Sequence, residues 1–470
     1  MFNLIVNFIT AYVLGYYLIT TLQWYNYKLK RVIFHFSNYK WHLFYFVIPI
    51  VTYIVAYEFF WIYLFFGLIP ALFLWNKRVE NLVITGRVKR FFLFLGFIET
   101  INLVLLNKLH YNPGISILAV IILAVLISEI TENILFLKYK KQAKEKLNKI
   151  NPTIITITAS YGKTSIKNFL YELLKDNFIA YKTPRSVNTL KGIVKDINTT
   201  LPINTQIYIV EAGAREKGDI VEIVDFLENE YSILGKVGPQ HIEYFKTLEN
   251  IKNTKLEIFK TKNLKKGFSY EIPYNEKVEV IKDKIKDVRA NLDGIKWKLE
   301  IDNSLVEFES KILGEFNAIN VSLAIFQTLE LGVDIEKIKE KVLKLSPVPH
   351  RLKKMEVGGK IIIDDSFNGN LEGMLASYKL ASTYDGRRVI ITPGIVESTI
   401  EANVELAKRI DDVFDVAILT GKSNLDILNK NIDKAEKIVV KDKREIEKIL
   451  EEFTRKGDLI LFSNDTPAFM

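Results

Sequence analysis

Long apolar runs separated by short polar segments dominate the first 140 residues. Each run is close to the roughly 20 residues that a helix needs to cross a hydrocarbon core. The runs cover residues 2–22, 41–57, 59–75, 91–107 and 114–137. This pattern predicts a transmembrane domain of five helical spans at residues 1–140.

The pattern changes at residue 151 to short β-rich runs that alternate with amphipathic helical segments. Such alternation is typical of parallel sheets covered by helices. Strands are predicted at 153–158, 207–211, 231–237, 361–364, 388–392, 416–420 and 458–463, and helices at 164–175, 219–229, 248–260, 317–331, 335–344, 371–382, 401–411 and 443–455. A Lys-rich stretch at 261–310 is interpreted as short antiparallel strands beside the main sheet.

These elements predict an α-helical membrane domain followed by an α/β part with two domains. Ser346-Pro347-Val348-Pro349 is a natural hinge between them. We therefore expect a basic linker at 141–150, a central nucleotide-binding domain at 151–345 and a Rossmann-like domain at 346–470.

Charge is distributed unevenly along the chain. Residues 1–150 hold 16 Lys/Arg and 6 Asp/Glu, whereas residues 151–470 hold 48 and 49. The basic residues of the first part lie in alternate loops between the apolar runs, which predicts an external N-terminus and a cytoplasmic α/β part. The nearly neutral α/β part argues against a nucleic-acid partner. The chain has no cysteine, which excludes disulfides and thiolate chemistry.

One turn has the layout of a phosphate-binding loop. The run ASYGKTS at 159–165 follows a β-rich segment and opens a helical one. In that layout backbone N–H groups face an anion, the lysine reaches the outer phosphates and the threonine hydroxyl is a ligand for Mg²⁺. ATP binding is thus predicted, with these contacts at Ser160, Tyr161, Gly162, Lys163, Thr164 and Ser165.

Three further residues are candidates for site chemistry, although none is diagnostic alone. Glu211 ends a predicted strand, where a carboxylate beside a phosphate-binding loop is placed to hold Mg²⁺. His241 follows the next strand, and Lys255 lies on a predicted helix. A lone histidine in the core and a surface lysine in an ion pair are the ordinary alternatives.

Taken in order, seven motifs of the α/β part resemble the Mur ligase family, most closely its MurF branch. They are ASYGKTS, VEAGA, GPQHIEYF, NTKLEIF, LGEFNAIN, PHRLKKM and IDDSFNGN. The resemblance covers nearly all of 151–470. It implies an ATP-dependent ligase that adds D-alanyl-D-alanine to a UDP-N-acetylmuramoyl-tripeptide in peptidoglycan synthesis, through an acyl phosphate.

The resemblance also implies roles for single residues. Lys163 and Arg351 would contact the outer phosphates, Asn317 and Asn320 the adenine, and Asp365 the nucleotide. Two Mg²⁺ ions would be held by Thr164, Glu211, His241 and Lys255. Lys255 would be carbamylated. Substrate would be bound by Asn188, Asn368 and Asn370. The catalytic residues would be Lys163, His241, Lys255 and Arg351.

The front of the chain departs from the family, because apolar runs stand where MurF enzymes carry a soluble UDP-binding domain. We therefore expect a multi-pass protein of the bacterial inner membrane, with its catalytic domains in the cytoplasm, in contact with membrane lipid and possible membrane-bound cell-wall enzymes. The acceptor could be UDP-linked or lipid-linked. Two alternatives stay open: another carboxylate–amine ligase of the superfamily, and an ATP-regulated transporter or scaffold.

Overall fold

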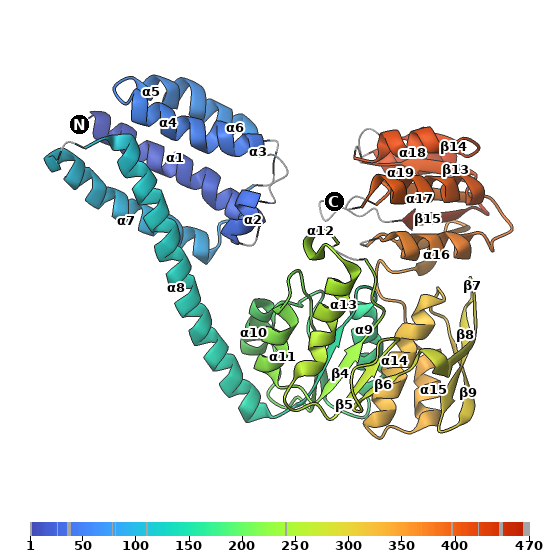
Figure 1. Ribbon diagram of the computed structural model, residues 1–470. Helices are drawn as coiled ribbons and strands as arrows, with labels where there is room; N and C mark the ends of the chain where they lie inside the picture. The colour runs from blue at the N-terminus through green and yellow to red at the C-terminus, as the bar shows by residue number, and fades with distance from the viewer. Residues whose placement is uncertain are drawn as a thin grey trace. The chain divides into compact units, whose positions relative to one another are not determined.

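The computed structural model describes residues 2–463 except residues 26, 35–38, 78, 80, 110, 240, 241, 368, 396, 397, 422 and 441–444. The chain forms two compact units, Met1–Lys141 and Gln142–Met470. Figure 1 shows that the first unit is helical and that the second combines helices with sheets.

The first unit is built from helices whose buried faces pack against one another. Its helices are α1 (Phe2–Trp24), α2 (Leu29–Phe34), α3 (Tyr39–His42), η1 (Leu43–Val47), α4 (Ile48–Val55), α5 (Phe60–Tyr63), η2 (Leu64–Leu68), α6 (Ile69–Asn76), α7 (Gly86–Leu109) and the first part of α8 (Pro113–Ile150). Leu14, Tyr53, Leu64, Phe91 and Ala124 are among the fully buried side chains.

Three helices of the described residues, rather than the five predicted, are long and apolar enough to cross a membrane. These are α1, α7 and α8, by length and composition only. The apolar runs at 41–57 and 59–75 form the shorter helices Lys40–Val55 and Phe60–Asn76. The chain leaves helical geometry between them at residues 56–59, so neither reaches the length of the other three.

Helix α8 continues without interruption through the segment that we predicted as a basic linker. Two of its lysines contact their own unit. Lys144 forms an ion pair with Glu228 at 2.9 Å, and Lys146 Nζ donates to the Ile197 carbonyl at 2.7 Å. Residues 142–150 therefore pack against the α/β unit as the end of a helix.

The second unit begins with a six-stranded parallel sheet in the order β2-β3-β1-β4-β5-β6. Its strands are β1 (Thr153–Thr158), β2 (Ala180–Lys182), β3 (Ile207–Glu211), β4 (Tyr231–Leu234), β5 (Lys266–Ser269) and β6 (Val278–Val280). β1 and β3 are buried on both faces, as expected of strands covered by helices on each side.

The helices that follow these strands are amphipathic, and several begin at a capping side chain. They are α9 (Lys163–Leu174), α10 (Leu190–Thr199), α11 (Asp219–Leu227), α12 (Ile242–Phe245), α13 (Leu248–Leu256) and η3 (Glu257–Lys260). Thr189 and Thr247 accept backbone N–H groups at the starts of α10 and α13, which satisfies donors that a helix leaves free at its first turn.

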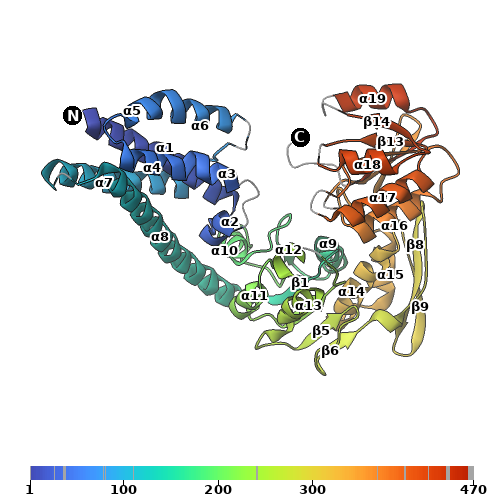
Figure 2. The ribbon, with the colours of Figure 1, turned by 45° about the horizontal axis from the view of Figure 1, so that its top comes forward.

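A three-stranded antiparallel sheet packs on two further helices of this unit (Figure 2). The elements are η4 (Lys282–Lys284), β7 (Ile285–Asn291), β8 (Gly294–Ile301), β9 (Ser304–Ser310), α14 (Phe316–Glu330) and α15 (Ile335–Leu343). The antiparallel interpretation of 261–310 is therefore correct for β7–β9 and wrong for β5 and β6. These two strands extend the parallel sheet because their short runs pair with β4 and with each other.

The second six-stranded sheet has the order β10-β11-β15-β12-β13-β14, parallel except for the β10–β11 pair. Its elements are β10 (Lys353–Val357), β11 (Lys360–Asp365), α16 (Leu371–Ala381), β12 (Arg388–Thr392), α17 (Ile400–Val413), β13 (Val416–Leu419), α18 (Leu425–Asn431), β14 (Glu436–Val439), α19 (Ile446–Phe453) and β15 (Leu459–Ser463). Most predicted strands and helices of this region exist within about two residues of their expected ends. β10, α18 and β14 were not predicted.

Candidate functional site

The candidate site lies where three neighbouring strands of the first sheet end. Chain order reverses on the two sides of β1, since β3 and β2 lie on one side and β4, β5 and β6 on the other. The carboxyl ends of parallel strands at such a reversal form the crevice in which open α/β sheets bind ligands. The loops after β1, β3 and β4 all reach this crevice.

The loop between β1 and α9 is held by its neighbours. Ser160 N donates to the Lys236 carbonyl and Ser160 Oγ to the Gly238 carbonyl, both at 2.9 Å. Gly162 has a φ of +84°, a conformation that glycine adopts at little cost. A Cβ at this position would lie 2.4 Å from Asn320 Oδ1. Glycine is therefore required at residue 162 both by the backbone and by space.

Lys163 opens α9 and turns back over this loop. Its Nζ donates to the Ala159 carbonyl at 2.6 Å and to the Ser160 carbonyl at 3.2 Å. Burial lowers the pKa of the Lys163 ammonium to about 8, against an opposing effect of Glu211 and with a further lowering by Arg351. The next residues, Thr164 and Ser165, form the first turn of the helix. Burial raises the pKa of the preceding Tyr161 to about 12.

Glu211 is the last residue of β3, and its carboxylate is almost fully buried. Thr164 Oγ1 donates to Glu211 Oε2 at 3.1 Å, and Asn188 Nδ2 lies 3.4 Å from Oε1. The predicted ligands Thr164 and Glu211 and the predicted substrate residue Asn188 are thus brought together by three segments. The loop after β3 packs closely against Asn188, since a Cβ on Gly213 would lie 2.8 Å from Asn188 Cγ.

Lys167 also contacts Glu211 and was missed by the sequence analysis. Its Nζ lies 3.0 Å from Glu211 Oε2, and the side chain is 1% exposed. The only signal in the sequence is a lysine on the apolar stripe of α9, next to Ile166 and Phe169. A pattern of that kind does not say which acceptor lies opposite.

Lys255 is a buried lysine of α13, as its predicted role requires. It is 2% exposed, and its Nζ lies 3.5 Å from Thr158 Oγ1 at the end of β1. Burial, reinforced by the charge of Lys163, holds the pKa of Lys255 well below its ordinary value. Its surface-lysine alternative is therefore wrong. His241, the remaining predicted metal ligand, lies outside the described residues.

The two predicted adenine contacts lie on one face of α14, which packs against α9. Asn320 Nδ2 donates to Asn317 Oδ1 at 3.0 Å, and Asn317 Nδ2 donates to the Leu313 carbonyl at 2.8 Å. Both side chains are buried. Asn320 lies over the loop at Gly162, so the pair is placed beside the predicted phosphate-binding loop.

Arg351 and Asp365 belong to the hinge and to the end of β11. The Arg351 guanidinium lies 5.0 Å from the centre of the Phe367 ring. Burial lowers the pKa of Arg351, whereas the charges of Glu211 and Asp365 raise it. Burial raises the pKa of Asp365 to about 7, and Arg351 opposes that rise. The positive charge of Arg351 therefore interacts with the carboxyl groups of both Glu211 and Asp365.

The backbone around Arg351 is pinned by its neighbours. His350 has a φ of +62°, and its Nδ1 lies 2.9 Å from Asp364 Oδ2. Ser366 Oγ donates to Asp364 Oδ1 at 2.5 Å, and Phe367 N donates to the His350 carbonyl at 3.3 Å. These contacts hold the hinge against the end of β11.

The predicted substrate residues of the second sheet are only partly placed. Asn370 is the N-cap of α16, and its Oδ1 accepts from Gly373 N at 3.0 Å. Its side chain thus has a structural partner. Asn368 lies outside the described residues. The first turn of α16 is also tied to the first sheet by an ion pair between Glu372 and Lys236.

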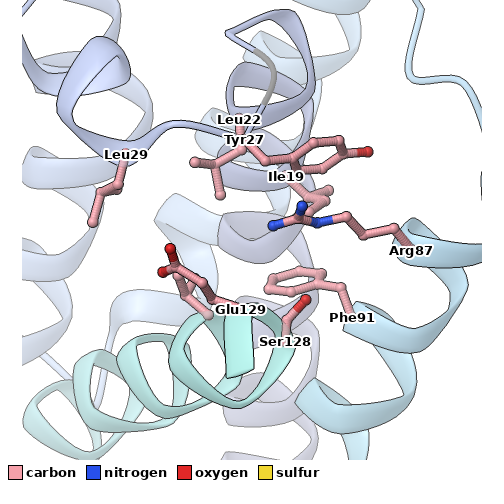
Figure 3. A pocket seen from close by; sticks show the side chains of 9 residues that line it. Ile19, Leu22, Tyr27, Leu29, Arg87, Phe91, Ser128 and Glu129 are labelled. Carbon is pink, nitrogen blue, oxygen red and sulfur yellow. The ribbon is translucent and has the colours of Figure 1, made fainter. Parts of the chain in front are cut away.

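The helical unit has a separate pocket beside Arg87 (Figure 3). The guanidinium carbon lies 3.8 Å from the centre of the Tyr27 ring, and Ser128 and Glu129 line the other side. The free volume is about 10 Å³, which is about the space that one water needs. This pocket has no room for a nucleotide or a peptide.

Comparison with known proteins agrees with the site in the α/β unit. Residues 157–327 match the Mur ligase middle domain. The chain is 24% identical over 347 residues to the UDP-N-acetylmuramoyl-tripeptide–D-alanyl-D-alanine ligase of Bacillus subtilis, covering 68% of this chain and 74% of that one. The ligase of the same name from Borreliella burgdorferi is 24% identical, covering 47% of this chain and 51% of the relative.

A solved structure shows the same relationship. The MurF ligase of Thermotoga maritima, in complex with ADP, superposes with a TM-score of 0.62 and 25% identity, covering 70% of this chain and 80% of that one. The α/β unit is therefore MurF-like in sequence and in fold, and ATP dependence with Mg²⁺ is typical of such ligases.

The prediction of a multi-pass inner-membrane protein is wrong when set against these relatives. MurF homologues are soluble cytoplasmic enzymes. That prediction was based on the long apolar runs. The length of an apolar run does not distinguish a membrane-spanning helix from a helix that buries one face against its neighbours. Helix α1 buries such a face, with Asn7 and Thr10 among its buried residues.

Proposed function

We propose that this chain, whose α/β unit is a MurF-like Mur ligase, is an ATP-dependent ligase that joins D-alanyl-D-alanine to a UDP-N-acetylmuramoyl-tripeptide. One observation supports this proposal most strongly. The first sheet brings together Lys163, Thr164, Glu211 and Lys255 at the point where its strand order reverses. The names of the relatives supply the substrates.

The proposed nucleotide site is the loop at 159–165. Gly162 lets the backbone approach an anion closely, and α9 begins directly after it, so that the N-terminus of the helix lies at the loop. In the structure Lys163 Nζ is held by two carbonyls of its own loop. Nucleotide phosphates would be stronger acceptors for an ammonium than these carbonyls, so we infer that Lys163 exchanges them on binding. Asn317 and Asn320 are proposed for the adenine side.

The residues around Glu211 fit Mg²⁺. A buried carboxylate and a hydroxyl oxygen 3.1 Å apart are hard oxygen donors, which this ion prefers. We propose Thr164 and Glu211 for one ion, and His241 with Lys255 for a second. Bound Mg²⁺ would neutralise charge on the transferring phosphoryl group.

Lys255 would need a carbamate to act as a metal ligand, because an ammonium repels a cation. A neutral Nζ amine attacks the carbon of CO₂, forms the N–C bond and loses a proton, which leaves an anionic carbamate. The depressed pKa of Lys255 supports this proposal, since it makes the neutral amine available. The burial of the side chain would protect the product.

The proposed reaction has two balanced steps. A carboxylate oxygen of the tripeptide attacks the γ-phosphorus of ATP, the bond to the bridging oxygen breaks and ADP leaves. The amine of D-alanyl-D-alanine then attacks the acyl carbon and loses a proton, and the C–O bond to phosphate breaks. Lys163 and Arg351 would balance charge on the phosphoryl group. Asn188, Asn368 and Asn370 are proposed on the substrate side, and Asp365 near the nucleotide.

The test uses the purified full-length chain with ATP, Mg²⁺, D-alanyl-D-alanine and the UDP-linked tripeptide. We expect phosphate release that requires both acceptor and dipeptide, and a product identified by mass. Lys163→Ala should abolish release. Lys175→Ala is the matched control, because Lys175 lies at the other end of α9 and is exposed, paired with Glu172.

Other results would redirect the proposal. No phosphate release with either substrate pair, or full release by Lys163→Ala, would overturn it. Release with a different amine, or only with a lipid-linked acceptor, would favour another ligase of the superfamily. ATP hydrolysis that ignores every acceptor would favour the transporter or scaffold alternative.

A further inference from the structure

Lys167 contacts the site, and neither the motifs nor the relatives' names account for it. It lies one helical turn after Lys163, and its side chain is 1% exposed. Its Nζ contacts Glu211 Oε2 at 3.0 Å and donates to the Arg185 carbonyl at 2.5 Å. A lysine is rarely buried to this extent unless its charge is paired.

The burial of this pair is expensive as a way to stabilise a fold. Removing both a carboxylate and an ammonium from water costs several kcal/mol for each, and well-packed apolar residues are often as stable. The core beside it shows that apolar packing is available here, since Ile166, Phe169 and Leu170 on the same helix are buried. The placement of an ion pair at the end of β3 therefore calls for a role in the site.

The contacts of Lys167 tie three segments together. The lysine comes from α9, the carboxylate ends β3, and the Arg185 carbonyl belongs to the loop that also carries Asn188. Thr164 and Lys167 hold Glu211 Oε2 from α9, while Asn188 approaches Oε1 from the loop. The carboxylate is thus held from both sides, which fixes its orientation.

We propose that Lys167 is a positioning residue that orients the Glu211 carboxylate for a divalent cation and couples it to the 183–188 loop. This inference rests on the proposed function only in taking Glu211 as an Mg²⁺ ligand. Without the ammonium, the side-chain donors left to the Glu211 carboxylate among the described residues are the neutral groups of Thr164 and Asn188. We expect the carboxylate to turn toward other partners. The cation would then meet a ligand in the wrong orientation.

The experiment measures Mg²⁺ binding and not turnover. The melting temperature of the full chain is recorded at saturating ADP over a series of Mg²⁺ concentrations, which gives the concentration for half of the Mg²⁺-dependent rise. We expect Lys167→Met to raise this concentration about tenfold, in the range seen when supports of metal ligands are removed. Lys167→Arg keeps the charge and should recover most of the loss.

Lys182→Met is the matched control. Lys182 is also partly buried and contacts the same helix, donating to Asn168 Oδ1 at 2.5 Å. Its contacts with Asn168 and the Tyr171 ring lie away from Glu211. It should lower the melting temperature without changing the half-saturating Mg²⁺ concentration.

The outcomes separate this proposal from the proposed function. A folded Lys167→Met protein whose Mg²⁺ requirement is unchanged or lower overturns the positioning role, and so does a wild-type protein whose ADP binding ignores Mg²⁺. If Lys167→Met does not fold, the same criterion is applied to Lys167→Gln. Failure of the wild type to ligate, with normal Mg²⁺-dependent ADP binding, rejects the ligase substrates and leaves the Lys167 result readable.

Discussion

The two six-stranded sheets of the α/β unit both place an acid at the end of a strand, but they surround it differently. Glu211 ends β3 with a lysine 3.0 Å away and a hydroxyl at 3.1 Å. Asp365 ends β11, where burial outweighs the attraction of Arg351 and raises its pKa to about 7. Glu211 is paired with a buried ammonium, whereas burial is the dominant influence on Asp365.

The position of an acidic residue at the end of a strand therefore does not by itself determine its function. Each acid is the last residue of its strand, and a loop and a helix follow it. Their electrostatic surroundings decide which of them suits a cation. Glu211 fits a metal ligand, whereas a carboxyl with the raised pKa of Asp365 donates as well as accepts hydrogen bonds.

The largest effect should come from Glu211→Gln. The amide keeps the shape of the side chain but removes the charge that faces Lys167 and the proposed Mg²⁺. We expect phosphate release to fall on the order of 100-fold or more, with a higher Mg²⁺ requirement. Steady-state rates over a Mg²⁺ series test this. Equal rates for the variant and the wild type would remove the distinction between the two acids.

A second test concerns the basic residue that completes the first site. If Lys255 carries a carbamate, depletion of CO₂ and bicarbonate should lower activity about tenfold, and bicarbonate should restore it. The measurement is phosphate release in degassed and replenished buffer. Lys255→Met should be slow and insensitive to CO₂. A wild-type enzyme that is equally insensitive would contradict the carbamate.

Asp365→Asn should affect stability in a pH-dependent way. The folded pKa of about 7 lies above the ordinary value of 3.8, so the folded state binds this proton more tightly than the unfolded state. The aspartate therefore costs stability increasingly as pH rises from about 4 to 7. The variant should gain several degrees in melting temperature over the wild type at pH 8, and less at pH 5.

The control for this test is Asp287→Asn, since Asp287 is an exposed acid whose pKa is lowered by its pairing with Lys298. It should show no such gain at pH 8. A melting temperature for Asp365→Asn that is pH-independent relative to wild type would contradict the raised pKa of Asp365 in the folded protein.

The smallest effect is expected from Asn370, which separates a helix cap from a substrate contact. Asn370→Ala removes the side-chain acceptor for Gly373 N and should cost about 1 kcal/mol, or roughly 2–4 °C. Asn370→Ser keeps a capping oxygen and should restore stability. If Asn370→Ser also restores the KM for the dipeptide, the capping role alone explains the effect of Asn370→Ala. If the KM of Asn370→Ser stays raised, the result favours a contact between Asn370 and substrate.

Much of the first site was predictable because its residues are local to strong signals. The strand–loop–helix at 153–175 follows from β-branched residues, a small-residue turn and an amphipathic stripe. Glu211 was predicted because a strand end is visible in sequence. The roles of Asn317, Asn320 and Arg351 depended on the family resemblance, since each lies far along the chain from the loop that it approaches.

The misses share a physical cause. The five predicted spans depended on apolar length, and length does not report where a helix ends or what covers its faces. Lys167 was missed because a lysine on an apolar stripe has no visible partner in sequence.

By itself the sequence determined the alternation of strands and helices, the glycine-containing loop, the acid at the end of β3 and the separation of an apolar first part from an α/β second part. These depend on side-chain periodicity and short-range backbone preference. Only the tertiary structure decided that Lys167 meets Glu211, that Lys255 is buried, and that the acids at the ends of two strands have different partners. Each of these depends on which atoms exclude water from a group and which donors reach it. Segments that lie far apart in the sequence contribute those atoms.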